Sequence, residues 1–413
     1  MEFFSRYKKI FFLAGFLLIV IGLGYAIYAL FFRPSITPTV VDTGPVETST
    51  GNGLPTAQTG TGQIVSPEGA SQLSGEPGTT AAKADPTAQG GLTETAILTE
   101  QPTVGATVAG NGSDVQYYNS SDGKFYRTDK NGRATELSSK VFHEVKTVVW
   151  SPDKNSAVLE YPDGANIIYD FSTGKQVTLP AHWKDFSFSP DGGQIALKSM
   201  GEDPDNRWLA VVSKDGSKMR GVERIGENDA SVYSAWSPNN QMIAMYTEGV
   251  DFDRQEVYFV GLNGENFKST VVEGRGLDPK WSPTGHELVY SVYSSANSLK
   301  PNLWAVVAEG DQIGNNRRNL EVETWASKCS FSGGTKLYCA VPQNLEKGAG
   351  LFPELAEHTA DRLYQIDLTT GGKKMIAIPQ GDYTISNILV SDDNKNLYFN
   401  DKNSGKLYKI KLK

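Results

Sequence analysis

The sequence predicts an all-β fold, a β-propeller of seven or alternatively six blades, preceded by one transmembrane helix and a disordered stalk. Three observations support this prediction: an apolar run near the N-terminus, a stretch without aromatic residues after it, and two short phrases that recur along residues 113–413. We therefore divide the chain into a cytoplasmic tail (1–9), a transmembrane helix (10–32), a linker (33–112) and a propeller (113–413).

The overall composition already excludes several classes of protein. The chain has 413 residues, of which 39% are hydrophobic, with 39 basic and 47 acidic side chains and a formal net charge of −8. This apolar content excludes a fully disordered chain, and it is too low for a polytopic membrane protein. A negative net charge without a Lys/Arg-rich block argues against nucleic acid as a partner.

Residues 10–32 carry no charged side chain. A helix of that length spans about 34 Å, enough for a hydrocarbon core of roughly 30 Å. Arg6, Lys8 and Lys9 precede this run, and only Arg33 follows it closely. The positive-inside rule then predicts a single-pass protein of the inner or plasma membrane, with a cytoplasmic N-terminus and a periplasmic or extracellular propeller. A cleavable signal peptide is the alternative; its apolar region would be shorter and would end in a small-residue cleavage site, so an uncleaved signal-anchor is favoured.

The segment that follows, residues 34–112, contains no Phe, Tyr or Trp and only one basic residue, Lys83. It is rich in Thr, Gly and Pro. Such a segment cannot bury enough apolar surface to offset its chain entropy. We expect a disordered stalk that holds the rest of the chain away from the membrane.

The first recurring phrase places an aromatic residue before Ser-Pro and a polar residue. The four full copies are Trp150-Ser-Pro-Asp153, Phe188-Ser-Pro-Asp191, Trp236-Ser-Pro-Asn239 and Trp281-Ser-Pro-Thr284, and degraded copies begin at Phe331 and Val390. A short β-type run follows each copy. The aromatic residue would end an inner strand, and the polar side chain would cap a tight turn that sends the chain back antiparallel.

The second phrase pairs an apolar residue, or Arg207 in one copy, with an aromatic or apolar one, and it marks the third strand of each unit. Its seven copies are separated by 42, 40, 50, 46, 60 and 44 residues, and they are centred on Tyr126, Ile168, Trp208, Tyr258, Trp304, Tyr364 and Tyr408. A four-stranded unit of this size cannot bury both of its faces alone, whereas units arranged radially cover one another. Seven copies favour seven blades. The first unit, beginning near Val115, would lack its inner strand, and the last would lack its outer strand.

These phrases resemble the TolB-type propeller repeat of bacterial periplasmic proteins, a WD40-like blade. The resemblance covers about 300 residues and implies a propeller fold. It implies no single function, because the same blade occurs in peptidase and lyase propellers. The α/β domain that precedes the TolB propeller is replaced here by the anchor and the stalk.

No catalytic constellation is visible in the sequence. The four His residues are scattered, none has a partner at metal-ligand spacing, and no nucleophile elbow or phosphate-binding loop occurs. We therefore expect no metal site and no cofactor.

The loops between the second and third strands should emerge together on one face, near the central channel, where binding residues tend to lie. The candidate ligand-binding residues on these loops are Glu202, Asp203, Asp205, Arg207, Asp251, Asp253, Arg254, Glu354, Glu357 and Arg362.

Two functions fit these features. The favoured one is a membrane-tethered extracytoplasmic platform that binds a protein or another cell-envelope component. The alternative is a propeller enzyme, a hydrolase or lyase, with its site at the central channel. The features do not identify the partner.

The only two cysteines, Cys329 and Cys339, flank the turn of the degraded phrase at Phe331. In an antiparallel hairpin centred on Gly334 they would face each other, close enough for a disulfide after a small shift. Two small buried hydrophobic residues are the alternative.

Overall fold

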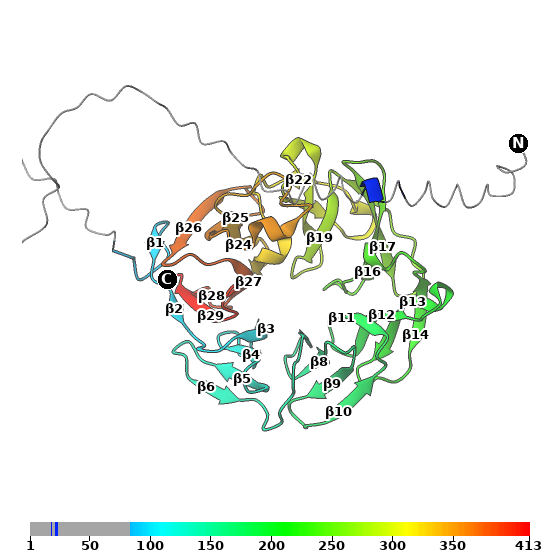
Figure 1. Cartoon of the computed structure of the whole chain (residues 1–413), viewed down its shortest axis with the longest axis horizontal. Helices are drawn as coiled ribbons and strands as arrows, with labels where there is room; N and C mark the ends of the chain where they lie inside the picture. Colours follow the sequence, from blue (N-terminus) through cyan, green and yellow to red (C-terminus); the bar gives the residue numbers. More distant parts are fainter. Residues whose placement is uncertain (1–17, 19–20, 24–82) are drawn as a thin grey trace, which may run out of the picture. The chain divides into compact units, whose positions relative to one another are not determined.

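The computed structural model describes Leu18, residues 21–23 and residues 83–413. From residue 83 onward the chain forms seven sheets arranged around a central opening (Figure 1). The first strands of most successive blades contact one another around this opening. The seven-bladed prediction is confirmed.

Each blade is numbered in chain order. Blade 1 contains β3 (Thr103–Val108), β4 (Val115–Asn119), β5 (Lys124–Thr128) and β6 (Ala134–Glu136). Blade 2 contains β7 (Thr147–Trp150), β8 (Ser156–Glu160), β9 (Asn166–Asp170) and β10 (Gln176–Leu179). Blade 3 contains β11 (Trp183–Phe188), β12 (Gln194–Met200), β13 (Arg207–Ser213) and β14 (Arg220–Arg224). Blade 4 contains β15 (Val232–Ser234), β16 (Met242–Gly249), β17 (Gln255–Gly261) and β18 (Thr270–Val272).

The remaining three blades include the two that receive strands from the N-terminal side. Blade 5 contains β19 (Arg275–Trp281), β20 (Glu287–Tyr293), β21 (Asn302–Val307) and β22 (Arg318–Asn319). Blade 6 contains β23 (Cys329–Ser332), β24 (Lys336–Pro342), β25 (Asp361–Asp367), β26 (Lys373–Pro379) and β1 (Leu92–Thr93). Blade 7 contains β27 (Ile385–Val390), β28 (Asn396–Asp401), β29 (Leu407–Lys411) and β2 (Ala96–Ile97).

Short 3₁₀ turns lie in the connections between strands. They are η1 (Pro204–Asn206), η2 (Asp229–Ser231), η3 (Ser295–Asn297), η4 (Gly310–Gln312), η5 (Ala326–Lys328) and η6 (Pro353–Ala356).

An N-terminal strap, residues 84–99, closes the ring. Within it, β1 pairs in parallel with β26 of blade 6, and β2 pairs antiparallel with β29 of blade 7. The strap therefore supplies the outer strand that blade 7 lacks in the sequence pattern, and it covers the outer edges of two neighbouring blades (Figure 1). Covering exposed edges in this way removes a route to edge-to-edge association.

The predicted boundary of the linker at residue 112 is wrong. Strands β1, β2 and β3 all lie before residue 113, and β3 is the inner strand that the first unit seemed to lack. The strands before residue 113 carry no aromatic residue, and their apolar residues pack on aromatic partners elsewhere; Ala106, for example, joins a cluster with Tyr117 and Tyr398. The rest of the predicted linker, residues 33–82, lies outside the described residues.

The predicted transmembrane span also lies largely outside the described residues. Of that span the structure describes Leu18 and residues 21–23, which are helical. Among the described residues, no helix has the length and apolar character needed to cross a membrane.

The hydrophobic core lies between neighbouring blades. Met245 of β16, for example, shares one cluster with Leu288 and Tyr290 of β20. The aromatic residue that ends an inner strand adds a polar tie to the preceding blade: the Trp150 indole donates to the Gly105 carbonyl at 2.7 Å. Each blade thus depends on its neighbours for burial, as the radial arrangement predicts.

The Ser-Pro turns are closed by both of their polar side chains. Asp191 Oδ1 accepts from the Gly193 backbone N–H at 3.0 Å, as the turn prediction requires. Ser189 Oγ donates to Asp191 Oδ1 at 2.5 Å and accepts from the Gln194 N–H at 2.9 Å. The serine hydroxyl therefore provides a hydrogen-bond acceptor for the first residue of the returning strand, where the chain reverses.

Candidate functional site

The connections between the second and third strands emerge on one face of the propeller, here called the loop face. They comprise residues 201–206 in blade 3, 250–254 in blade 4, 294–301 in blade 5 and 343–360 in blade 6. The start of each inner strand lies at the same end of its blade, because the second strand runs antiparallel to the first. The loop face therefore also carries one mouth of the central opening.

Three of these loops form one continuous structure, the loop ridge, made of residues 250–254, 294–301 and 343–360. Asp253 Oδ1 accepts from the Ser295 backbone N–H at 2.6 Å, which joins the loops of blades 4 and 5. The Gly348 and Gly350 N–H groups donate to the carbonyls of Ser298 and Leu299 at 2.9 and 2.8 Å, which joins blades 5 and 6.

Gly350 explains how the long blade 6 loop can lie so close to blade 5. A Cβ atom at this position would lie 2.5 Å from the Tyr293 Cβ and 2.8 Å from the Leu299 carbonyl oxygen. No side chain larger than hydrogen fits that contact without a shift of the backbone.

The loop ridge carries most of the large apolar side chains that the propeller leaves exposed. Eight such side chains are exposed within residues 83–413, and five belong to the ridge: Val250, Phe252, Leu351, Phe352 and Leu355. The Phe252 side chain is 71% exposed and that of Phe352 is 52% exposed. Exposed apolar side chains that gather on one surface mark an interaction site, whereas single ones need no explanation.

Of the four predicted site residues in blade 3 (Glu202, Asp203, Asp205 and Arg207), Asp203 and Arg207 stabilise their own loop through their side chains. Arg207 Nε donates to the Gly201 carbonyl at 3.0 Å, and its Nη2 donates to the Glu202 carbonyl at 3.4 Å. Asp203 caps η1 by accepting from the Asp205 N–H at 3.0 Å. No described hydrogen bond or ion pair joins this loop to the ridge.

The predicted residues of blade 4 are also internally paired. Arg254 Nη2 lies 2.7 Å from Asp251 Oδ2, and both side chains are exposed. Asp253 is used in the contact with Ser295 described above. In blade 6, the Glu357 carboxylate pairs with Lys402 of blade 7 at 3.0 Å, and Arg362 Nη2 donates to Gln343 Oε1 at 3.4 Å. Glu354 is exposed in the first turn of η6.

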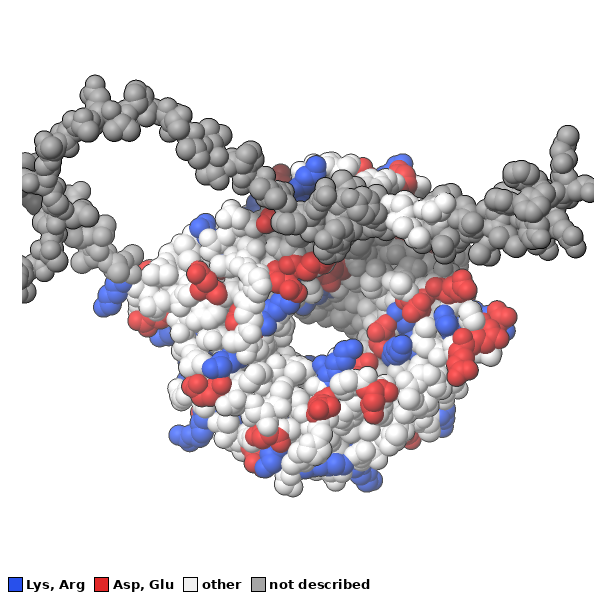
Figure 2. Space-filling model, in the orientation of Figure 1, with Lys and Arg blue, Asp and Glu red and all other residues white. Residues whose placement is uncertain are grey.

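Most of the charged residues predicted to contact a ligand thus form hydrogen bonds or ion pairs that stabilise the loops themselves. The structure brings those of blades 4 and 6 onto the ridge, whereas those of blade 3 stand apart. Figure 2 shows both Lys or Arg and Asp or Glu side chains near the central opening on the face in view. This mixed charge agrees with the polarity expected at the rim of an interface.

Beside the ridge, blades 5, 6 and 7 enclose a pocket of about 300 Å³, here called the axial pocket. Its lining residues are Asp278, Trp325, Ser327, Lys328, Pro353, Ala356, Thr384, Ile385, Ser386 and Lys402. None of these was among the predicted site residues. Because blade 6 carries a degraded repeat and its long loop folds over the blade, the sequence pattern contained no signal for this pocket.

A buried ion pair forms part of the structure beneath the pocket. Lys328 Nζ donates to both Asp361 carboxylate oxygens at 2.7 and 2.8 Å, and Asp361 Oδ2 also accepts from the Ile385 N–H at 2.6 Å. The Asp361 side chain is fully buried and that of Lys328 is 10% exposed. Burial raises the pKa of Asp361 and lowers the pKa of Lys328, and in each case the attraction between the two opposes the shift.

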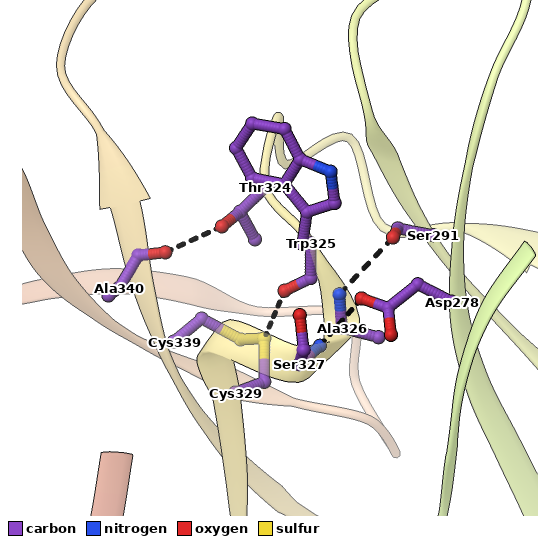
Figure 3. Close-up of a disulfide and its surroundings, with 9 residues drawn as sticks. All are labelled: Asp278, Ser291, Thr324, Trp325, Ala326, Ser327, Cys329, Cys339 and Ala340. Carbon is purple, nitrogen blue, oxygen red and sulfur yellow. Dashed lines mark hydrogen bonds between the residues drawn. A yellow bond between two sulfur atoms is a disulfide. The ribbon is translucent and has the colours of Figure 1, made fainter. Parts of the chain in front are cut away.

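A disulfide joins Cys329 to Cys339 immediately after this segment (Figure 3). The two cysteines are direct partners in the register of β23 and β24, as the hairpin centred on the turn predicts. Both are fully buried between blades 5 and 6.

The wall of the pocket formed by residues 324–328 is tied to its surroundings on both sides (Figure 3). Thr324 Oγ1 donates to the Ala340 carbonyl at 2.6 Å, on the strand that carries Cys339. Toward blade 5, the Ala326 N–H donates to Ser291 Oγ at 3.2 Å and the Ser327 N–H donates to Asp278 Oδ2 at 2.8 Å. The disulfide therefore fixes one end of a pocket wall.

The histidines do not converge on a site. His286 Nδ1 lies 2.6 Å from Glu309 Oε2, with both side chains exposed. In the part of the chain that the structure describes, no group of three His, Cys, Asp or Glu side chains is arranged to hold a metal ion.

Comparison with known proteins identifies only the fold. No family model matches the sequence, and no curated protein matches it. An oligogalacturonate lyase in complex with manganese is similar in structure, with a TM-score of 0.50 and 15% identity over 77% of this chain and 93% of that one. An oligogalacturonate lyase from Vibrio parahaemolyticus has a TM-score of 0.50 and 11% identity over the same shares of the two chains.

A third similar structure is the hydrazine synthase of Kuenenia stuttgartiensis. Its TM-score is 0.51 at 15% identity, and the match covers 82% of this chain and 99% of that one. At such identities the likeness shows the propeller fold alone. It decides neither for an enzyme nor for a binding platform.

Proposed function

We propose that this chain is a membrane-tethered, extracytoplasmic propeller that binds a partner protein of the cell envelope through the loop ridge. The observation that carries the proposal is that three connected loops hold five of the eight large apolar side chains exposed within residues 83–413. Apolar and aromatic side chains surrounded by polar groups are the composition of protein–protein interfaces.

Two further features support the placement outside the cytoplasm. Disulfides persist in oxidising compartments and are rare in the cytosol, so the buried Cys329–Cys339 bond favours a periplasmic or extracellular propeller. The apolar run at residues 10–32, with its basic residues on the N-terminal side, supports the same orientation. The resemblance of the Ser-Pro repeat to TolB-type propellers is consistent with both.

Site-specific photocrosslinking in intact cells tests the proposal. A photoreactive amino acid at Phe352, on the ridge, should yield a defined adduct with one partner protein. The same amino acid at Met219 is the matched control, because Met219 is 44% exposed and lies between the third and fourth strands of blade 3, at the opposite end of the blade. The adduct should disappear when Phe252 and Leu355 are both changed to Ser.

Two results would contradict the proposal. One is that positions 352 and 219 give the same adducts, which would mean that the ridge is not a specific binding surface. The other is a partner adduct that survives the Phe252→Ser/Leu355→Ser double substitution, which would place the interface elsewhere.

A further inference from the structure

The axial pocket adjoins the loop ridge through a single short turn. Pro353 and Ala356 of η6 line the pocket, whereas Phe352 and Leu355 of the same segment are exposed on the ridge. A partner segment that lies on the ridge is therefore within reach of the pocket mouth. This continuity relates the pocket to the proposed interface.

The charged side chains of the pocket are mostly neutralised by the protein itself. Lys328 pairs with Asp361, and Lys402 pairs with Glu357. Asp278 forms no such pair, although its charge acts on the neighbouring Lys280 of β19. Within residues 83–413 it takes part in no salt bridge, and only its Oδ2 is bonded, to the Ser327 N–H at 2.8 Å. The pocket thus offers one uncompensated hydrogen-bond acceptor to a ligand.

The rest of the lining favours a flat apolar group. Trp325 is half-buried and packs against Leu345, Ala349 and Ala356, and Pro353 and Ile385 add apolar surface. The volume of about 300 Å³ is at the lower end of the roughly 300–1,000 Å³ that is typical of ligand pockets. A single aromatic ring fits such a space.

From these features we infer that the axial pocket receives one aromatic side chain of the partner protein, a Tyr or Trp whose O–H or N–H donates to Asp278. This inference rests on the proposed function. An aliphatic side chain would fill the space but leave the Asp278 acceptor unpaired. A Lys or Arg side chain would pair with Asp278 but would set a charged group against the apolar surface of Trp325, Pro353 and Ile385. Aromatic side chains seated in desolvated pockets dominate many protein interfaces.

Ligand-observed saturation-transfer NMR on the full-length chain in detergent tests the inference. The probes are N-acetyltyrosinamide, N-acetylleucinamide and N-acetylglucosamine. Transfer should appear on the tyrosine ring protons and be at least several-fold weaker for the other two. The Ser327→Trp variant should abolish the transfer to the tyrosine probe, because the larger side chain fills the pocket. Ser327 is exposed and its side chain makes no described hydrogen bond, so the substitution removes no such contact.

Two further variants separate the role of Asp278 from general effects. Asp278→Asn keeps an oxygen for the Ser327 N–H but removes the charge, so it should weaken tyrosine-probe binding by about three- to tenfold. Thr284→Trp is the matched control, because Thr284 is exposed and lines a different pocket, between blades 5 and 6 near their Ser-Pro-type turns. It should leave the transfer unchanged.

Several outcomes would overturn the inference. Transfer to N-acetylglucosamine alone would make the pocket a carbohydrate site, and equal transfer to the leucine and tyrosine probes would remove the role of Asp278. No transfer to any probe, or transfer that persists in Ser327→Trp, would also refute it. If the adduct from position 352 forms at unchanged yield in the Ser327→Trp variant, the inference about the pocket is wrong while the proposed function stands. If no adduct forms from position 352 in the chain without Ser327→Trp, the proposed function itself is wrong.

Discussion

Lys328 and Asp361 join the η5 turn to blade 6 and, through the Ile385 N–H, to blade 7. Removing one partner leaves a buried charge without compensation, so Lys328→Met should lower the free energy of unfolding by about 3–5 kcal/mol. The double variant Lys328→Met/Asp361→Asn carries no buried charge and keeps an acceptor for Ile385. It should recover much of that loss. Denaturant unfolding of the three proteins measures this, and a double variant no more stable than Lys328→Met would contradict it.

The Cys329–Cys339 disulfide closes a short loop, with a sequence separation of 10 residues. The chain-entropy model assigns about 2–3 kcal/mol to a loop of this size. Protein purified without reductant should show a mass two hydrogens below that of the reduced chain, and both cysteines should resist alkylation after denaturation. Replacing both with Ala should lower the free energy of unfolding by at most that amount. Quantitative alkylation of both thiols without reductant would show that the bond does not form in the cell.

At the level of the element, the Ser-Pro turns make the propeller sensitive to acid. Hydrogen bonds from the Ser189 hydroxyl and then the Gly193 N–H lower the pKa of Asp191. A carboxyl whose folded-state pKa lies below its unfolded value, about 3.9, contributes stability above that pH and loses it as pH falls through the folded pKa.

Denaturation midpoints at pH 7 and pH 3 therefore provide the test for these turns. The midpoint should fall on acidification, and it should fall less in Asp191→Asn than in the unmodified chain. Asp382→Asn, in an exposed turn, controls for the loss of one negative charge. Equal pH dependence in all three proteins would mean that the Asp191 turn contributes nothing to acid sensitivity.

Elements that recur were predictable from the sequence, and elements that occur once were not. The Ser-Pro turns and the alternation of the third strands repeat every 40–60 residues, so their period alone indicated seven blades. The inner strand Thr103–Val108 contains no aromatic residue, since its burial is provided by aromatic residues of blade 7, such as Tyr398, and of its own blade. The axial pocket depends on Gly350 and a loop that crosses to another blade, which no local pattern encodes.

At the level of the whole molecule, the strap should be essential to the stability of the ring. Six backbone hydrogen bonds join the strap to β26, to the Gln380 N–H just after β26, and to β29. The strap residues that form them are Ala88, Gly90, Gly91, Thr93, Leu98 and Thr99. At about 1 kcal/mol net for each, a chain that begins at residue 100 should lose on the order of 5 kcal/mol relative to one that begins at residue 83.

Thermal unfolding and size-exclusion chromatography of the two truncated chains measure this difference. The longer chain should be monomeric and unfold cooperatively, whereas the shorter one should unfold at lower temperature and associate through the bare edges of β26 and β29. Equal unfolding temperatures would show that the ring closes without the strap.

The predicted orientation in the membrane has its own test. Protease added to intact cells, or to spheroplasts where an outer layer intervenes, should cut within residues 33–82 and release a compact fragment that begins near residue 83. A fragment beginning at residue 113 would conflict with the strands before that position. Full protection until the membrane is lysed would refute the proposed orientation.

The position of the strap also determines where the propeller bears mechanical load. Residues 84–99 are the first part of the propeller after the linker in sequence, so a pull transmitted along the chain reaches the ring at the seam between blades 6 and 7. Such a pull meets the parallel contact of β1 with β26 first and the antiparallel contact of β2 with β29 next, before it reaches β3 of blade 1. The segment that connects the propeller to the preceding residues is thus also the segment that supplies the outer strands of blades 6 and 7.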